Sequence, residues 1–119
     1  MDNMELKKQL EELPGKIKDE EVKILNYITG IEKKKRETLR RELVLVEGIG
    51  KDPALTNTEL RINAKKKLLD TDKDYLKLSK ELEDLEYTME NERIELKLLL
   101  NKMNCFKSVV KLEEVMQHE

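Results

Sequence analysis

Apolar residues recur every three or four positions along most of this chain, and this spacing restricts its fold more than any other feature. The clearest run lies toward the C-terminal end, and it consists of Tyr75, Leu78, Leu82, Leu85, Met89, Leu96, Leu99, Met103, Phe106 and Val110, with Glu92 at one position in phase. Such spacing puts the side chains on one face of an α-helix, as in the seam of a coiled coil. The pattern predicts a long helix packed against another helix.

A second run fills the N-terminal part of the chain. Its members are Leu6, Leu10, Leu13, Ile17, Ile24, Ile28 and Ile31, followed after a one-residue shift by Leu39, Leu43 and Val46. Pro14 interrupts this run, and a proline inside a helix costs about 3 kcal/mol or more. We expect a kink or a break there. The chain should keep its direction, because the apolar phase is the same on both sides.

Residues that end and start helices follow this second run. Gly48 and Gly50 favour a helix end in the left-handed conformation. Thr56 and Glu59 match a capping box, which predicts that a short helix over 57–69 starts there.

The cluster 70–72 is rich in capping residues and predicts a break before the last helix. We therefore predict one all-α domain over residues 1–119, a long antiparallel coiled-coil helical hairpin with a short helix at the tip. Its arms are 2–47 and 72–116, and its tip is 48–71. At 1.5 Å per residue the two arms have matched lengths of about 69 and 68 Å.

The composition agrees with a helical binding protein. Of the 119 residues 42% are charged and 3% are aromatic, with four Gly and two Pro. A β-sandwich or barrel needs more turn residues, and most enzymes need an apolar, aromatic-lined cavity. No apolar run is long enough to cross a membrane, and the first residues lack the features of a signal peptide. The sequence predicts a cytoplasmic protein that is not an enzyme.

Candidate catalytic groups are few. The single histidine, His118, stands next to the last residue, and the single cysteine, Cys105, has no histidine near it in the sequence. A lone cysteine also excludes a disulfide within the chain. Neither a Cys/His set with zinc spacing nor a Glu-x-x-His pair is present. We expect no catalytic residue, no metal and no cofactor.

The stretch Gly48-Ile49-Gly50-Lys51 has two further interpretations. It lacks the flanking Gly and the Ser or Thr of a Walker loop. It resembles the Gly-Ile-Gly turn of helix-hairpin-helix DNA-binding motifs, but Asp52-Pro53 follows where those motifs continue into a helix. We favour a helix cap and turn.

Charge is unevenly distributed along the chain. Residues 1–22 have four basic and seven acidic side chains (net −3), residues 23–80 have fifteen and nine (net +6), and residues 81–119 have five and ten (net −5). In a hairpin this order concentrates cations near the tip. We call this set the basic tip, and its members are Lys33, Lys34, Lys35, Arg36, Arg40, Arg41, Arg61, Lys65, Lys66 and Lys67.

Positive charge attracts nucleic-acid phosphates and acidic proteins alike. The alternative is a solvated helix surface whose cations pair with carboxylates one turn away. The chain has 19 Lys, five Arg and few aromatic residues, which disfavours base stacking and sequence-specific recognition. A macromolecular partner, protein or nucleic acid, is expected, with no small-molecule substrate.

Some apolar residues lie outside both runs, and a helix that is apolar on several sides is usually buried. The segment 43–46 is one such patch, which the short helix is expected to cover. A second patch is expected to contact another copy of the chain and consists of Ile94, Leu98, Leu100, Val109, Leu112 and Met116. We predict a homo-oligomer, with a dimer favoured.

Polar residues at two seam positions predict the register of the hairpin. If facing residue numbers total about 119, Glu92 lies near Tyr27 and Lys35 lies near Asp84. Polar groups within a seam can fix register at a cost in stability.

Several segments resemble a group of known proteins, and they are Thr56-Asn57-Thr58-Glu59-Leu60-Arg61, Leu68-Leu69, Asp74-Tyr75-Leu76, Glu81-Leu82 and Leu99-Leu100-Asn101 through Phe106. This pattern, which covers about residues 56–112, is similar to that of small uncharacterised coiled-coil proteins of phages and prophages of Gram-positive bacteria. The resemblance implies an accessory role around DNA metabolism. The architecture is also similar to that of prefoldin subunits, although their arms are joined through β-hairpins.

Three functions agree with these observations. The first is a helical binding or adaptor protein, a phage or prophage accessory factor that engages an acidic protein or a nucleic-acid backbone through the basic tip. The second is a nucleic-acid-binding accessory protein of replication or recombination. The third is a prefoldin-like holdase chaperone that uses apolar arm ends.

Overall fold

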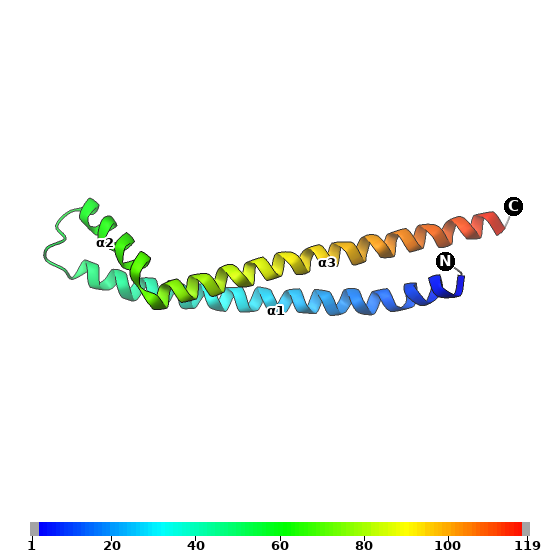
Figure 1. Cartoon of the computed structure of the whole chain (residues 1–119), viewed down its shortest axis with the longest axis horizontal. Helices are drawn as coiled ribbons and strands as arrows, with labels where there is room; N and C mark the ends of the chain where they lie inside the picture. Colours follow the sequence, from blue (N-terminus) through cyan, green and yellow to red (C-terminus); the bar gives the residue numbers. More distant parts are fainter. Residues whose placement is uncertain (1–2, 118–119) are drawn as a thin grey trace. The chain divides into compact units, whose positions relative to one another are not determined.

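The computed structural model describes residues 3–117, which form three helices: α1 (Asn3–Gly50), α2 (Thr58–Thr71) and α3 (Lys73–Gln117) (Figure 1). No strand occurs within this described range. The expected class is confirmed, because the structure is an all-α antiparallel helical hairpin with a short helix between its two long helices.

The helices build two compact units. The terminal unit comprises the chain up to Tyr27 and from Thr88 onward, and the central unit comprises Ile28–Tyr87. Each unit contains a part of α1 and a part of α3, and α2 belongs to the central unit.

An apolar interface holds the terminal unit together. Its buried apolar side chains on α1 are Leu6, Leu13, Ile17 and Ile24. The half-buried apolar side chains on α3 are the predicted ones, namely Met89, Leu96, Leu99, Met103, Phe106 and Val110. In this unit the 4-3 spacing therefore does identify the side chains that pack.

Pro14 lies inside α1, and the helix continues through it without the break that was one of the two expected outcomes. The ring of a proline removes one backbone hydrogen bond. Packing on both sides offsets this loss, since Leu13 is 1% exposed and Ile17 is 8% exposed.

The central unit is paired differently, and here the expected one-residue shift of the seam was wrong. Leu39 and Leu43 are 53% and 58% exposed, and of the three expected side chains Val46 alone is half-buried. The helix keeps its earlier phase instead. The side chains it buries or half-buries there are Ile28, Ile31, Lys34, Glu37, Thr38, Arg41, Glu42, Leu45, Val46 and Ile49.

The ion pairs across the hairpin do not fall at the residues that the expected register indicated. In the terminal unit Glu92 forms an ion pair with Lys23, and in the central unit Glu81 forms one with Lys34. The residue numbers of each pair total 115 rather than about 119. Lys35, expected in the seam, is exposed, and its neighbour Lys34 takes the inward position.

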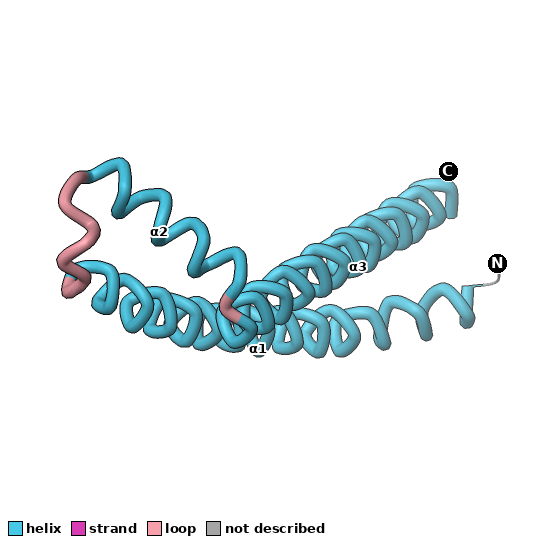
Figure 2. The backbone as a smooth tube through the Cα atoms, turned by 60° about the vertical axis from the view of Figure 1, so that its left-hand side comes forward, coloured by secondary structure: helices cyan, strands magenta, loops and turns pink. Residues whose placement is uncertain are grey.

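Neither glycine at the end of α1 takes the left-handed conformation that was expected. The helix runs on to Gly50, and no glycine within the described residues has a positive φ. The buried side chain of Ile49 keeps this last turn packed, and the Ile49 carbonyl accepts a hydrogen bond from the backbone N–H of Asp52. Asp52 then accepts one from the N–H of Ala54 and begins the loop to α2 (Figure 2).

Helix α2 starts one residue later than the capping-box pattern indicates. The cap is Asn57 rather than Thr56, and its side-chain oxygen accepts a hydrogen bond from the N–H of Leu60 at 2.8 Å. The predicted break after α2 is present and consists of a single residue, Asp72, which lies between α2 and α3.

Candidate partner-binding surface

Asp72 connects the three helices of the central unit. Its backbone N–H donates a hydrogen bond to the carbonyl of Leu68 at the end of α2. Its carboxylate accepts a hydrogen bond of 2.8 Å from the backbone N–H of Tyr75 at the start of α3. The same carboxylate accepts two hydrogen bonds from Arg41 of α1, at 2.7 and 2.9 Å. One residue therefore caps two helices and joins their junction to the third.

This arrangement changes the acidity of the group. The hydrogen bonds from Arg41, and next the backbone hydrogen bond from Tyr75, lower the pKa of Asp72 to about 2. The same pairing raises the pKa of Arg41. A bidentate contact between guanidinium and carboxylate fixes direction as well as distance, so it orients α1 against the junction of α2 and α3.

Two more ion pairs bind the inward face of α1 in the central unit. Lys34 donates to Glu81 of α3 at 2.6 Å, and this contact raises the pKa of Lys34 and lowers that of Glu81. Lys65 of α2 approaches Glu42 at 2.9 Å. These polar contacts occupy the positions that apolar residues occupy in the terminal unit.

These contacts divide the basic tip into two groups. Four of its members are engaged within the chain: Lys34, Arg41 and Lys65 in the ion pairs above, and Arg61 in a hydrogen bond to the carbonyl of Leu55 at 3.2 Å. The other six make no ion pair or hydrogen bond with their side chains within residues 3–117, and they are Lys33, Lys35, Arg36, Arg40, Lys66 and Lys67.

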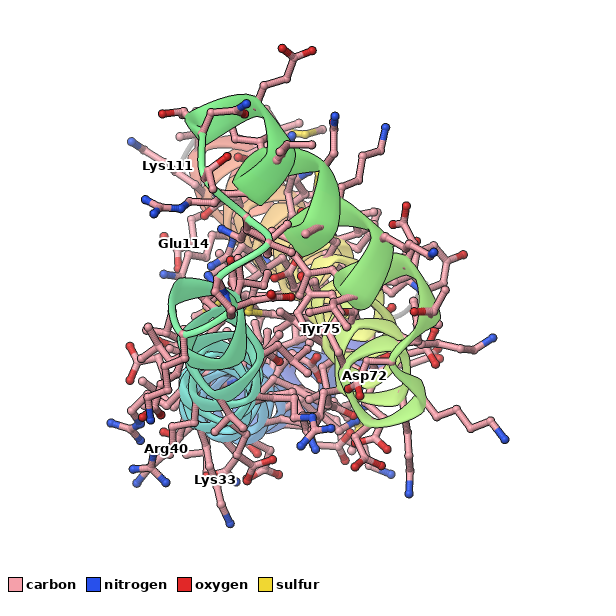
Figure 3. All side chains as sticks on the ribbon, turned by 90° about the vertical axis from the view of Figure 1, so that its left-hand side faces the viewer. Lys33, Arg40, Asp72, Tyr75, Lys111 and Glu114 are labelled. Carbon is pink, nitrogen blue, oxygen red and sulfur yellow. The ribbon has the colours of Figure 1, made fainter. Side chains whose placement is uncertain are left out.

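Three of the six share the outward face of α1. Lys33, Arg36 and Arg40 are spaced by three and four residues, which places them on one side of a helix. All three are exposed, and Figure 3 shows Lys33 and Arg40 extending outward from α1. None of the three forms an ion pair within residues 3–117.

Exposed apolar side chains continue this face toward the end of α1. Leu39, Leu43 and Val44 are 53%, 58% and 57% exposed. Of the segment 43–46, which α2 was expected to cover, Leu43 and Val44 stay exposed, whereas Val46 lines a pocket with α2 on a different side of α1. We call Leu39, Leu43 and Val44 together with Lys33, Arg36 and Arg40 the outer α1 face.

The terminal unit contains one unusual polar group, Glu20. This residue is 9% exposed, and one of its carboxylate oxygens has no hydrogen-bond partner in the described residues. A hydrogen bond with Glu92, and next burial, raise the pKa of Glu20 above its ordinary value. Lys23 lies 3.6 Å from Glu92 and partly compensates the two acids.

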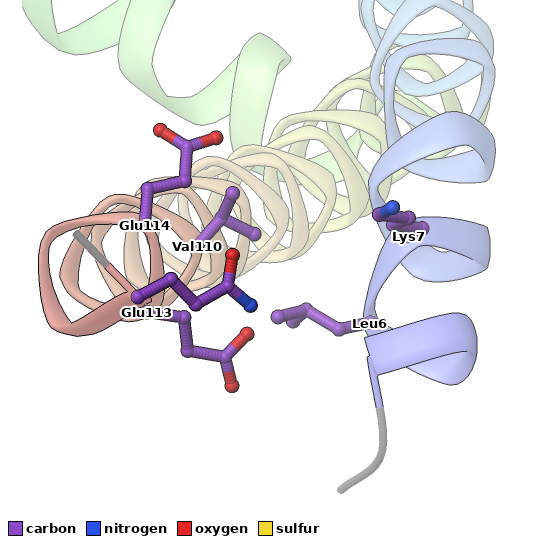
Figure 4. Close-up of a pocket in the computed structure, with 6 residues that line it drawn as sticks. Leu6, Lys7, Val110, Glu113 and Glu114 are labelled. Carbon is purple, nitrogen blue, oxygen red and sulfur yellow. The ribbon is translucent and has the colours of Figure 1, made fainter.

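Cavities offer little for small-molecule chemistry. In the terminal unit Leu6 of α1 points toward Val110 and Glu113 of α3 beside an open cavity of 160 Å³ (Figure 4). In the central unit a cavity of 360 Å³ lies among the end of α1, the loop and α2, with Asp52 and Lys67 as its charged lining residues. Neither holds a nucleophile beside a base, which covalent catalysis requires.

The remaining chemical candidates are also dispersed. Cys105 is exposed, and His118 lies outside the described residues. Within residues 3–117 no group of three or more Cys, His, Asp or Glu side chains is placed to hold a metal ion. The same part of the chain has no helix whose length and apolarity would let it span a membrane.

The predicted oligomer contacts are all exposed. Ile94, Leu98, Leu112 and Met116 are 57%, 58%, 60% and 65% exposed, and Val109 is 44% exposed. Leu100, the sixth, is 43% exposed, but helical spacing puts it on another side of α3.

Comparison of the chain with protein-family models, curated proteins and solved structures finds no match.

Proposed function

We propose that this chain is a non-enzymatic helical binding protein whose outer α1 face docks an acidic, amphipathic protein segment. The observation that carries this proposal is the group of exposed cations Lys33, Arg36 and Arg40, which have no carboxylate partner in the described chain and adjoin exposed Leu39, Leu43 and Val44. A role as an accessory factor of a phage or prophage belongs to the same proposal and rests on the sequence resemblance.

The mixture of charge and apolar surface favours a protein partner. Carboxylates on one side of a partner helix would neutralise the three cations, and its apolar residues would cover the leucines and the valine. Aligned charges of opposite sign speed up association, and the apolar contact keeps the complex together.

Binding to a nucleic-acid backbone is the alternative function. It is favoured by the number of cations in the central unit without an internal partner, since Lys35, Lys66 and Lys67 add to the three on the outer α1 face. Such binding would use the cations alone and would fall steeply with salt.

A binding titration with two labelled probes tests the proposal. One probe is an amphipathic helical peptide with Glu and Leu on one face, and the other is duplex DNA. We expect the peptide to bind, the double reversal Arg36→Glu/Arg40→Glu to abolish binding, and Leu43→Gln to weaken it about tenfold, which corresponds to about 1.4 kcal/mol.

Lys7→Glu/Lys8→Glu is the matched control, because it reverses two exposed cations of α1 in the terminal unit. Arg41 is left unchanged because it holds Asp72. The alternative would be established if the chain binds DNA, if Leu43→Gln leaves this binding unchanged, and if added salt abolishes it. Peptide binding that survives the reversal at Arg36 and Arg40 would disprove the proposed docking on the outer α1 face.

A further inference from the structure

Helix α3 has a second apolar stripe in the terminal unit, on a side that α1 does not cover. Its exposed members are Leu98, Cys105, Val109, Leu112 and Met116, and Lys102 occupies the one remaining position of the 4-3-4-3-4 spacing. We call these six residues the outer α3 stripe. The inward seam of the same helix, with Leu99, Phe106 and Val110, is half-buried.

The surroundings of this stripe are unusually poor in charge. Between Leu98 and Leu112 three of fifteen residues are charged, whereas the whole chain is 42% charged. Asn101 and Ser108 line the side of the stripe that faces away from α1, and both are uncharged. A solvated helix surface of this chain would have charges at such positions, so this face is suited to being covered.

We propose that a second copy of this chain covers the outer α3 stripe, with the two α3 helices packed antiparallel about a two-fold axis. The six positions are symmetric about Lys107. An antiparallel pair therefore places Leu98 opposite Met116 of the other copy and Cys105 opposite Val109 in the alternating layers of a coiled coil. The stripe is thus complementary to itself over about 27 Å of helix.

Charge selects the antiparallel direction. A parallel pair in register would bring Lys102 against Lys102 of the other copy, and Glu95, about two turns before Lys102, against Glu95. The antiparallel pair puts Lys102 opposite Leu112 instead. The Lys102 ammonium lies 5.7 Å from the centroid of its own Phe106 ring, so its alkyl stem can pack in the layer while the charge stays outside.

The second copy packs against the outside of the terminal unit. Each copy contributes a helix pair whose apolar interior is already formed, and the two α3 helices form the new contact. The result is a four-helix arrangement of the kind that apolar stripes on paired helices favour. This inference is independent of the outer α1 face, because that face belongs to the central unit.

Sedimentation of the full chain at micromolar concentration tests the surface. We expect a dimer, and we expect Leu98→Glu to raise its dissociation constant at least 100-fold, because a charge would be buried in the contact. Leu100→Glu is the matched control, with the same change two residues away on another side of α3, and it should leave the dimer intact. A monomeric wild type, or equal effects of the two substitutions, would overturn the proposal.

Cross-linking tests the direction. In a Cys105→Ser background, Leu98→Cys and Met116→Cys chains are prepared separately, mixed and oxidised. We expect the mixture to form a disulfide-linked pair that neither variant forms alone. Disulfides within each unmixed variant would indicate a parallel pair, and no disulfide in any sample would contradict the register. Circular dichroism confirms that the helices persist, since every substituted side chain is exposed in the single chain.

Discussion

The terminal and central units both contain a part of α1 paired with a part of α3, yet different interactions hold the two pairs together. In the terminal unit four apolar side chains of α1 are buried, against two in the central unit, Ile31 and Ile49. The central unit uses cross-helix ion pairs instead, with Arg41–Asp72 the most constrained of them.

The difference explains where the exposed apolar residues occur. When charged side chains take the inward positions of α1, residues such as Leu39 and Leu43 are turned outward, because a helix has room for one inward stripe at a time. Polar pairing inside the central unit therefore produces an amphipathic surface outside it. In the terminal unit the inward face of α1 is mostly apolar, and both α1 and α3 have further apolar side chains on their exposed sides, among them Leu25 and Leu98.

The largest expected effect compares a buried apolar residue of the terminal unit with an exposed apolar residue of the central unit. Leu13→Ala removes a side chain that is 1% exposed, and we expect the free energy of unfolding to fall by about 3 kcal/mol. Hydrogen–deuterium exchange should show the lost protection in the terminal unit. The control Leu43→Ala, at a site 58% exposed, should change stability by less than about 0.5 kcal/mol. Equal losses from both substitutions would contradict the assignment of the core.

A smaller effect concerns the acid sensitivity of the central unit. Because the pKa of Asp72 is about 2 when folded and ordinarily 3.8, its ionised form stabilises the fold above pH 3.8. This contribution is lost as the pH falls from about 4 to about 2. Asp72→Asn keeps an acceptor for the N–H of Tyr75 but removes the charge, so it should lower protection at neutral pH and remove that part of the acid dependence.

Asp74→Asn is the control for this substitution, because Asp74 lies 3.9 Å from Arg41 and its side chain is 74% exposed. It should leave both the protection and its pH dependence nearly unchanged. If Asp74→Asn acts as strongly as Asp72→Asn, general charge rather than the bidentate contact holds the junction.

The smallest effect concerns the terminal unit, where the stability contributed by one carboxyl group falls as the pH rises, the opposite of the effect of Asp72. The pKa of Glu20 is raised when folded, so the folded state holds its proton more tightly than the unfolded state. Its contribution to stability is complete below the ordinary pKa of 4.5 and is lost as the pH rises through the raised value. Glu20→Gln should stabilise the terminal unit slightly at pH 7 and reduce this dependence.

Exchange protection of residues 17–27 at several pH values, corrected for the intrinsic exchange rate, measures this effect. Glu21→Gln, at an exposed neighbouring site, serves as the control. If acidification from neutral pH weakens the terminal unit in the wild type, the raised pKa is not what governs it.

The basic tip shows how far sequence could define a candidate site. All ten cations were identified from their clustering, but clustering could not separate Arg36 and Arg40 from Arg41. That separation depends on whether a carboxylate from another helix lies within reach, and Asp72 is 31 positions away in the chain. The exposed apolar side chains of the outer α1 face were missed, because regular spacing placed Leu39 and Leu43 in the seam and the short helix was expected to cover Val44.

The sequence alone determined the class of fold, the two long helices, the short helix between them and the break near Asp72. These features depend on local spacing and on capping residues, which act within a few positions along the chain. Only the tertiary structure decided the register, the inward phase of α1 in the central unit and the charges that remain unpaired. Those depend on which side chains from distant helices meet, and a 4-3 pattern is equally compatible with neighbouring phases and with registers one turn apart.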